Sequence, residues 1–299
     1  MWTGLIDHST LYGALRLDAQ RYDRASGKTL SSGHGTGFVI RVRELGESRE
    51  RAEFLVTNRH VVDPGFGPKG SSLKLLGALT VSGHHQPRRY RTLARPTPVK
   101  VTVPDPQPIF PKDPDIDLAV MRFDRKDREV VEGNGRFTTF DGTLIAEPWA
   151  YEDGHVHPGT QVLAAGYPAL GGQCDAERLI LVGGVVASDP RYPAEFEGAA
   201  FPDSVLCHAF SRAGMSGAPV FAPIQERRWE EDPEAPTVKF RLGIAGVNAG
   251  HLEMMGSSDG VISHFVKSTA LLEMLADLGS HNADMWVQIS RSFARTDWD

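Results

Sequence analysis

The chain has 299 residues, of which 40% are hydrophobic and 23% are charged, and its formal net charge is −6 with neutral histidines. This length suffices for one large domain or for two lobes. The mildly negative charge argues against a nucleic-acid partner, whose binding face would be basic. No apolar stretch approaches the roughly 18 residues of a membrane span. We therefore expect neither a nucleic-acid nor a membrane partner.

The cysteine content indicates the compartment. The chain contains two cysteines, Cys174 and Cys207, whereas a secreted domain of this kind usually has more, paired in disulfides. The first residues, Met1–His8, lack a basic start followed by an apolar run, so no signal peptide is predicted. We expect a cytoplasmic protein with reduced thiols.

Short apolar runs separated by Gly- and Pro-rich segments occupy the first half of the chain. Residues 11–22 alternate apolar and polar side chains in part, which favours a strand over a short helix. Residues 104–114 are rich in proline and indicate a surface loop. The other runs typical of strands are residues 35–42, 54–57, 73–76, 78–82, 90–94, 99–103 and 118–123.

The second half repeats this pattern until a helix near its end. Residues 224–237 are charged and proline-rich, which indicates an exposed loop. Apolar residues recur at intervals of three and four after Lys267, and Gly279 fits a C-terminal stop, so this segment is predicted to be helical. Many short strands with regular turns predict an all-β sandwich or pair of barrels. Its further strands are expected at residues 161–167, 179–187, 205–210, 219–221 and 240–247.

The polar stretch at residues 124–160 is where we place the crossover between two lobes. The predicted organisation is an N-terminal β-lobe of residues 1–150, a C-terminal β-lobe of residues 151–265, and a helix with a tail at residues 266–299. The last twenty residues contain Trp286 and Trp298, and they either pack on the body of the protein or bind a partner.

Three stretches contain the residue types that nucleophilic catalysis requires. In the first, residues 55–62 (LVTNRHVV), His60 comes directly after a β-type run, where a strand gives way to a turn. From such a rigid edge an imidazole can project and act as a general base. A surface histidine, or one that caps a core, would occupy the same kind of place.

In the second stretch, residues 115–121 (DIDLAVM), an aspartate leads an apolar strand. A carboxylate against a core is costly unless it is paired. An imidazole Nδ1–H is such a partner, and the carboxylate then sets the tautomer and stabilises the imidazolium. Asp115 and Asp117 both qualify, and we favour Asp117 because it abuts the apolar run. A solvated loop aspartate or a helix cap is the alternative.

The third stretch is Ser211–Phe221 (SRAGMSGAPVF), with Ser216 at its centre. A serine hydroxyl becomes nucleophilic when a base removes its proton. Glycines around it allow a tight turn and a close approach of substrate, and the backbone N–H groups of Gly214 and Ser216 are suited to bind the developing oxyanion. A Gly-x-Ser-Gly motif alone is also common as an ordinary turn, so its meaning depends on His60 and Asp117 upstream.

Together these stretches resemble the trypsin/chymotrypsin-like serine peptidases, and more closely the bacterial HtrA-type and glutamyl-endopeptidase-like branch. The order His60, Asp117, Ser216 is that of the chymotrypsin template. The resemblance extends over residues 11–279 and implies two packed six-stranded antiparallel β-barrels (chymotrypsin-like) with a C-terminal α-helix, and an active site in the cleft between the barrels. The matching segments are residues 35–38, 56–62, 117–120, 159–168, 214–220 and 243–248.

The chain departs from the digestive members of that family before the serine. Met215 stands where they have an aspartate that pairs with a freed N-terminus, and no Ile-Val-Gly-Gly-like segment is present. We expect a protein that is active as made or switched by other means, without a PDZ domain. The loop at 224–237 and the C-terminal tail are the segments through which a regulatory protein partner would act.

The resemblance also suggests the S1 pocket, which receives the side chain before the cleaved bond. It places Phe210 at the base of the pocket and Gly246, Val247 and Asn248 in its wall. No acidic residue stands at the base, so a small or apolar P1 side chain is expected rather than Lys or Arg. Alternatively, His264 lines the pocket and favours an acidic P1 residue.

The predicted function is a serine endopeptidase that acts through an acyl-enzyme on protein or peptide substrates, in an intracellular regulatory or defence role. The alternatives are a catalytically silent protein-binding module on the same fold and an effector whose oxyanion loop is ordered by a partner. The sequence contains no His-x-x-x-His or Cys-x-x-Cys pattern, so neither a metal nor another cofactor is expected.

Overall fold

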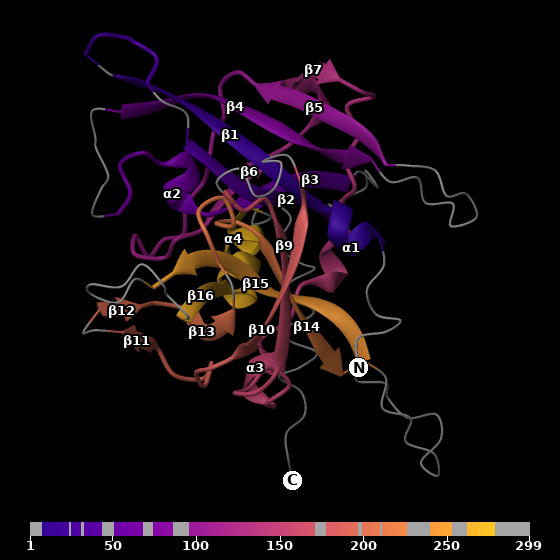
Figure 1. Cartoon of the computed structure of the whole chain (residues 1–299), viewed down its shortest axis with the longest axis vertical. Coiled ribbons are helices and arrows are strands. Elements are labelled where there is room, and N and C mark those ends of the chain that lie inside the picture. Colours follow the sequence, from indigo (N-terminus) through magenta and orange to yellow (C-terminus); the bar gives the residue numbers. More distant parts are fainter. Residues whose placement is uncertain are drawn as a thin grey trace.

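Two β-lobes follow one another along the chain and lie one above the other in Figure 1, the N-terminal lobe at the top. The predicted all-β fold class with a C-terminal helix is confirmed. This computed structural model describes residues 8–23, 25–30, 33–43, 51–67, 74–85, 96–170, 178–196, 199–209, 211–225, 240–252 and 262–278.

The N-terminal lobe is a sheet whose strands pair in the order β6–β3–β2–β1–β4–β5–β7, and β8 pairs in parallel with β2. Within the described residues this path does not close, whereas the family resemblance implied a closed barrel here. All side chains of the last strand, β7, are exposed, so burial of apolar surface does not hold this strand against the far edge of the sheet. The strands are β1 (Ala14–Asp23), β2 (Gly33–Arg43), β3 (Arg51–Thr57), β4 (Lys74–His85), β5 (Thr97–Val103), β6 (Ala119–Arg122), β7 (Glu129–Glu132) and β8 (Phe140–Asp141).

The C-terminal lobe is a closed antiparallel barrel in the order β10–β13–β16–β15–β14–β9. The expected six-stranded barrel is therefore present in this lobe. Its strands are β9 (Gln161–Gly166), β10 (Ile180–Val186), β13 (Ser204–Ala209), β14 (Pro219–Gln225), β15 (Phe240–His251) and β16 (Ile262–Lys267), and a separate hairpin is made by β11 (Ala194–Phe196) and β12 (Ala199–Phe201).

Helices are short except at the end of the described chain. The predicted C-terminal helix is α4 (Ser268–Leu278), which packs on β15 and β16. The expected crossover at 124–160 contains β7, β8 and three short helical segments, which are too brief for their periodicity to be read from sequence. In the described residues the short segments are α1 (His8–Tyr12), α2 (Arg59–Val62), α3 (Trp149–Glu152) and the 3₁₀ turns Arg125–Asp127 and Gly142–Leu144.

Three large apolar cores hold the lobes. One fills the N-terminal lobe around Leu17 and Leu55, and another fills the barrel around Phe265. The largest lies between the lobes and combines Phe38 of β2 with Phe221 of β14 and with residues of α4. Because this middle core is shared, the two lobes are held together by burial of apolar surface.

Most predicted strands are present, with several differences. The two runs at 73–76 and 78–82 form one strand, β4. The strand β16 was not predicted, because Ser263 and His264 interrupt its apolar pattern. The helix α1 precedes β1 where a strand was expected to begin. The predicted strand at 90–94, the residues 226–237 of the predicted loop, Gly279 and the tail lie outside the described residues.

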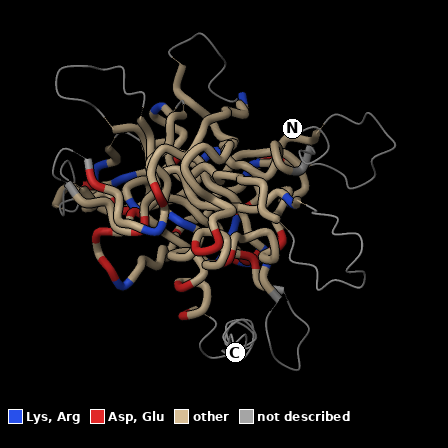
Figure 2. Tube along the Cα trace, turned by 90° about the horizontal axis from the view of Figure 1, so that it is seen from below, with Lys and Arg blue, Asp and Glu red and all other residues tan. Residues whose placement is uncertain are grey.

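Charged residues of both signs occur along the described chain (Figure 2). Figure 2 shows basic residues scattered among acidic ones along the trace. No helix in the described ranges is long and apolar enough to cross a membrane.

Tyr151 of α3 provides a test of how the crossover segment at 124–160 is joined to α4. Its side chain is 4% exposed, and its hydroxyl bonds the carbonyl of Ala245, lies 2.9 Å from Ser268 Oγ and accepts the Ser268 N–H at 3.2 Å. Burial raises the pKa of Tyr151 to about 12, so it is a neutral donor at pH 7. We expect Tyr151→Phe to lower the free energy of unfolding by about 1–3 kcal/mol, because buried polar groups lose their partner.

Urea unfolding at pH 7 measures this loss. The matched control is Tyr192→Phe, because Tyr192 is 66% exposed. An equal effect of the two substitutions would contradict the structural role of the Tyr151 hydroxyl.

Candidate active site

His60 and Asp117 form a pair joined by two hydrogen bonds. His60 lies in α2, directly after β3, and Asp117 lies two residues before β6. The His60 N–H donates to Asp117 Oδ1 at 3.0 Å, and Nδ1 lies 2.6 Å from Oδ2. The side chains are 37% and 16% exposed, respectively. With Nδ1 bound to the carboxylate, Nε2 is the ring nitrogen left to act on a substrate or a nucleophile.

The sequence leaves a choice between Asp115 and Asp117, and the structure shows that their surroundings differ. Asp115 is exposed, and its backbone N–H turns to the Asp113 side chain at 3.0 Å. Asp117 instead lies between Ile116 and Leu118, whose side chains are buried. The two buried neighbours turn the Asp117 side chain toward His60.

Asn58 holds the backbone at Asp117, and Arg21 holds the backbone at His60. The Asn58 side-chain amide donates to the backbone carbonyl of Asp117 at 2.7 Å. The Arg21 guanidinium, from β1, donates to the carbonyls of His60 and Val61, both at 3.2 Å. A four-residue helix has little stability of its own, so these contacts from the sheet set its position.

Arg59 fastens the same helix to the loop that leads to Asp117. Its guanidinium donates to the carbonyl of Pro114 at 3.0 Å and to Asp63 at 2.9 Å. It also lies 4.9 Å and 4.5 Å from the ring centres of Phe66 and Phe110. Sequence reasoning missed the roles of Asn58, Arg59 and Arg21, although the first two are neighbours of His60 in the chain.

Ser216 lies beside the His60 helix, although the two side chains are not bonded. A methyl group placed on Gly35 would lie 2.8 Å from a methyl of Val61 and 3.2 Å from the Ser216 carbonyl. Gly35 of β2 therefore lies against both α2 and the loop that contains Ser216. Between the described residues Ser216 and His60 there is no hydrogen bond. Such bonds are often long before substrate binds.

The backbone N–H groups around Ser216 differ in whether they have a hydrogen-bond acceptor. The N–H of Met215 donates to Arg212, and those of Gly217 and Ala218 donate to Asn248 and Met215. Among the described residues, the N–H groups of Gly214 and Ser216 donate to no acceptor. Both donors predicted from sequence are therefore available for a ligand in this part of the structure.

Two glycines allow the loop to take this shape. Gly214 and Gly217 have φ values of +92° and +88°, which residues with a β-carbon rarely adopt. A methyl on Gly217 would also lie 1.9 Å from the carbonyl of Thr36. The glycines around Ser216 thus serve the turn and the contact with β2.

The residues predicted for the S1 pocket have varied surroundings. Phe210 lies outside the described residues. Gly246 and Val247 are buried in β15, and Val247 belongs to the core between the lobes. The Asn248 side chain is turned inward, to Ser211 Oγ at 3.1 Å and to the Met215 carbonyl at 3.0 Å. The composition of the S1 wall stays a prediction.

His264, the alternative S1 residue, interacts electrostatically with Asp117 and His60. Burial lowers the pKa of His264 to about 4, while Asp117 raises it and His60 and His251 lower it. Its ring packs on Phe201, with centres 4.9 Å apart, and its Nδ1 has no partner among the described residues. His264 is therefore neutral at pH 7, and it offers an acidic P1 side chain no positive charge there.

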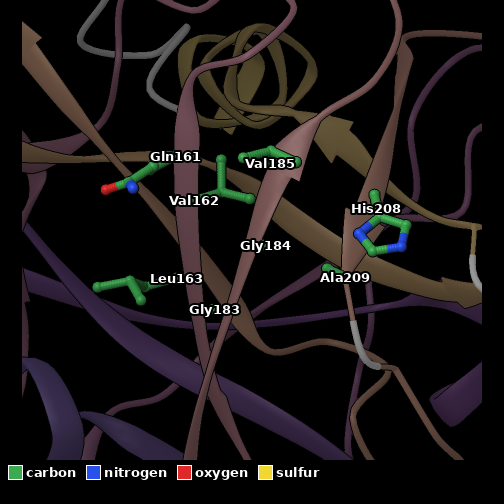
Figure 3. Close-up of a pocket in the computed structure, with 8 residues that line it drawn as sticks. All are labelled: Gln161, Val162, Leu163, Gly183, Gly184, Val185, His208 and Ala209. Carbon is green, nitrogen blue, oxygen red and sulfur yellow. The ribbon is translucent and has the colours of Figure 1, made fainter.

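A shallow hollow on the barrel lies apart from these groups (Figure 3). Neither His60, Asp117 nor Ser216 lines it, so it is not the candidate catalytic site. Its lining residues come from β9, β10 and β13 and are Gln161, Val162, Leu163, Gly183, Gly184, Val185, His208 and Ala209.

The described residues also include a free thiol, that of Cys207. Burial raises the pKa of the free thiol of Cys207 to about 11, so it stays protonated at neutral pH. In the described part of the chain, no group of three or more His, Cys, Asp or Glu side chains is placed to hold a metal ion.

A family model and a solved structure are similar to this chain. The family model described as trypsin-like peptidase domain matches residues 35–227. A solved structure titled "Crystal structure of Deg5" is similar to the chain with a TM-score of 0.46 and 16% identity, over 92% of each chain. No curated protein matches the sequence.

The neutral His264 predicts a specific sensitivity to acid. The ordinary pKa of 6.5 applies in the unfolded chain, and the folded value is about 4, so the unfolded state binds a proton first as the pH falls below 6.5. Protonation then favours unfolding, and we expect a loss of about 2 kcal/mol between pH 7 and pH 4.5 from this residue. His264→Gln removes that loss.

Urea unfolding at the two pH values measures the difference. His208→Gln serves as the control, since His208 is exposed, and it should lose stability as the unsubstituted chain does. If His264→Gln loses as much stability as the control on acidification, His264 is not buried in its neutral form.

Proposed function

The chain belongs to the family of trypsin-like peptidase domains, and we propose that it is a serine endopeptidase that cleaves peptide bonds through an acyl-enzyme. The observation that supports this most is the engagement of both Asp117 oxygens by His60. It leaves Nε2 of a held imidazole to accept a proton. The nucleophile in this proposal is Ser216, next to two available N–H donors.

The proposed reaction has two acyl-transfer steps. Ser216 Oγ attacks the peptide carbonyl carbon while His60 Nε2 takes the hydroxyl proton. The C–N bond then breaks, and His60 gives that proton to the leaving amine. Water repeats the sequence on the acyl-enzyme, and the released serine regains its proton from His60. Asp117 holds the imidazole in the tautomer with Nδ1–H and stabilises the imidazolium.

The oxyanion formed in each step binds to the N–H groups of Gly214 and Ser216. One such donor changes the rate by about 10²–10³-fold in related chemistry. Because the donors are backbone groups in a buried loop, they need little reorganisation when charge develops.

The proposed substrates are proteins or peptides with a small or apolar P1 side chain. The neutral state of His264 at pH 7 supports this over an acidic P1 residue. We place the enzyme in the cytoplasm, in a regulatory or defence role, and the free thiol of Cys207 is in keeping with a reducing compartment. A regulatory partner acting through the 224–237 loop or the tail stays a proposal.

A second candidate function is a protein-binding module that is silent or is activated by a partner. One observation favours it, namely that Ser216 and His60 are not hydrogen-bonded. In this case the isolated chain would be folded but unreactive.

A fluorophosphonate probe distinguishes the two functions, because it labels only an activated serine. We expect the unsubstituted chain to be labelled and Ser216→Ala to lose at least 99% of the label, roughly the 10²-fold or greater loss that removal of a nucleophile produces. Ser188→Ala is the control and should be labelled normally. A folded chain that never labels would support the silent module, and labelling of Ser216→Ala would place the nucleophile elsewhere.

The role of Asp117 has its own test with a matched neighbour. We expect Asp117→Asn to lower kcat by on the order of 10⁴, because the imidazole then adopts the wrong tautomer. Asp115→Asn should leave kcat within about twofold, since that exposed carboxylate is remote from the tautomer-setting bond. Peptide hydrolysis measures both, and the reverse ranking would overturn the assignment.

A further inference from the structure

The loop that contains Ser216 lacks the acidic anchor of the digestive peptidases, yet it is closely held. Met215 occupies the anchor position and is fully buried. A methyl on Gly166 would lie 2.9 Å from the Met215 sulfur, so the side chain packs directly on β9. Apolar packing alone does not orient peptide groups, because it is non-directional. Their orientation must come from hydrogen bonds.

The direction of the Ser216 N–H follows from the carbonyl of Met215. In a trans peptide unit the C=O and the N–H point in opposite directions. The Met215 carbonyl accepts from Asn248 Nδ2 and from the Ala218 N–H, both at 3.0 Å. As long as these bonds hold the carbonyl, the Ser216 N–H points the other way and stays available.

The same argument applies to the other donor. The Ala213 carbonyl, which shares a peptide unit with the Gly214 N–H, accepts from the Ala169 N–H at 2.8 Å. The Gly214 N–H therefore points away from Ala169. Each available N–H thus belongs to a peptide unit whose carbonyl, on the opposite side, accepts a hydrogen bond.

Thr36, which lies in the N-terminal lobe, bonds the carbonyls of Gly214 and Ser216 on either side of Met215. Its hydroxyl donates to the Gly214 carbonyl at 2.6 Å and accepts from the Tyr167 N–H at 3.1 Å. Its backbone N–H donates to the Ser216 carbonyl at 2.7 Å. Thr36 is fully buried, so no water can replace these bonds if the loop turns over.

We propose that Asn248 and Thr36 are positioning residues that keep the oxyanion loop receptive without a freed N-terminus or a bound partner. This inference rests on the proposed function only for its effect on rate, because the loop geometry exists without catalysis. A reversed Met215–Ser216 peptide would leave the buried Asn248 amide without this acceptor, which disfavours that state by roughly tenfold or more. The oxyanion loop therefore reaches its receptive shape as the chain folds.

Amide hydrogen exchange in the loop tests the proposal without relying on activity. We expect Thr36→Val and Asn248→Ala to accelerate exchange of the Met215, Gly217 and Ala218 amides by about tenfold or more, since loss of a buried bond weakens the loop by about that factor. Thr36→Ser keeps the hydroxyl and should exchange like the unsubstituted chain. Thr138→Val removes a largely buried hydroxyl far along the chain and is the matched control.

Circular dichroism and urea unfolding show first that each variant is folded. If one of the two main variants does not fold, the other decides the question. Loop exchange equal to that of the unsubstituted chain in a folded main variant overturns the proposal. Acceleration of the same size in Thr138→Val also overturns it, because the effect would then be general destabilisation.

Kinetics then separate positioning from a merely structural role. In both main variants we expect kcat to fall by about tenfold or more with KM within about twofold, because the oxyanion forms only in the transition state. The downfield proton resonance of the His60–Asp117 bond should remain, and its loss would contradict a role limited to the loop. If the unsubstituted chain neither cleaves peptides nor labels, the proposed function fails, while the exchange measurement still decides the loop proposal.

Discussion

The bond between the Thr36 hydroxyl and the Gly214 carbonyl is the contact on which the arrangement of the candidate site depends. It joins a strand of the N-terminal lobe to the loop of Ser216 in the C-terminal lobe, at 2.6 Å and in a buried place. Around it, Phe38 and Phe221 belong to one apolar core that both lobes share. Apolar burial supplies the affinity between the lobes, but it has no directional preference. The buried polar bonds set the angle and register at which the lobes meet.

The opposite side of the site is held by consecutive side chains. Asn58, Arg59 and His60 each bond the segment 114–117, through a backbone carbonyl in the first two cases and a carboxylate in the third. A hydrogen-bonded network of this kind loses more than one bond when a single member is removed, because the others lose their geometry. The His60–Asp117 pair is therefore a property of the whole turn, and not of two residues that happen to meet.

The fold class and the candidate catalytic groups could be predicted from the sequence better than the residues that hold these groups in place. The pattern favours Asp117 over Asp115 because Asp117 abuts an apolar run, and in the structure Leu118 of that run is buried and Asp117 bonds His60. The helix that contains His60 was read as a turn, since four residues show no period. The strand β16 was missed because Ser263 is buried through bonds to Cys207 and Ala209, which make a polar residue acceptable inside a barrel. Such compensation depends on partners more than fifty positions away and leaves no local signal.

What the sequence by itself determined is the order of His60, Asp117 and Ser216, the glycines that allow the turn around Ser216, and the absence of an acid at position 215. These depend on residue type and local spacing, which the chain states directly. Only the tertiary structure decided how the Gly214–Gly217 loop is held. The Asn248 side chain donates to the Met215 carbonyl, and Thr36 reaches the Gly214 carbonyl from the other lobe. Hydrogen bonds between segments distant in sequence arise only when packing brings donor and acceptor together, so no local pattern could reveal them.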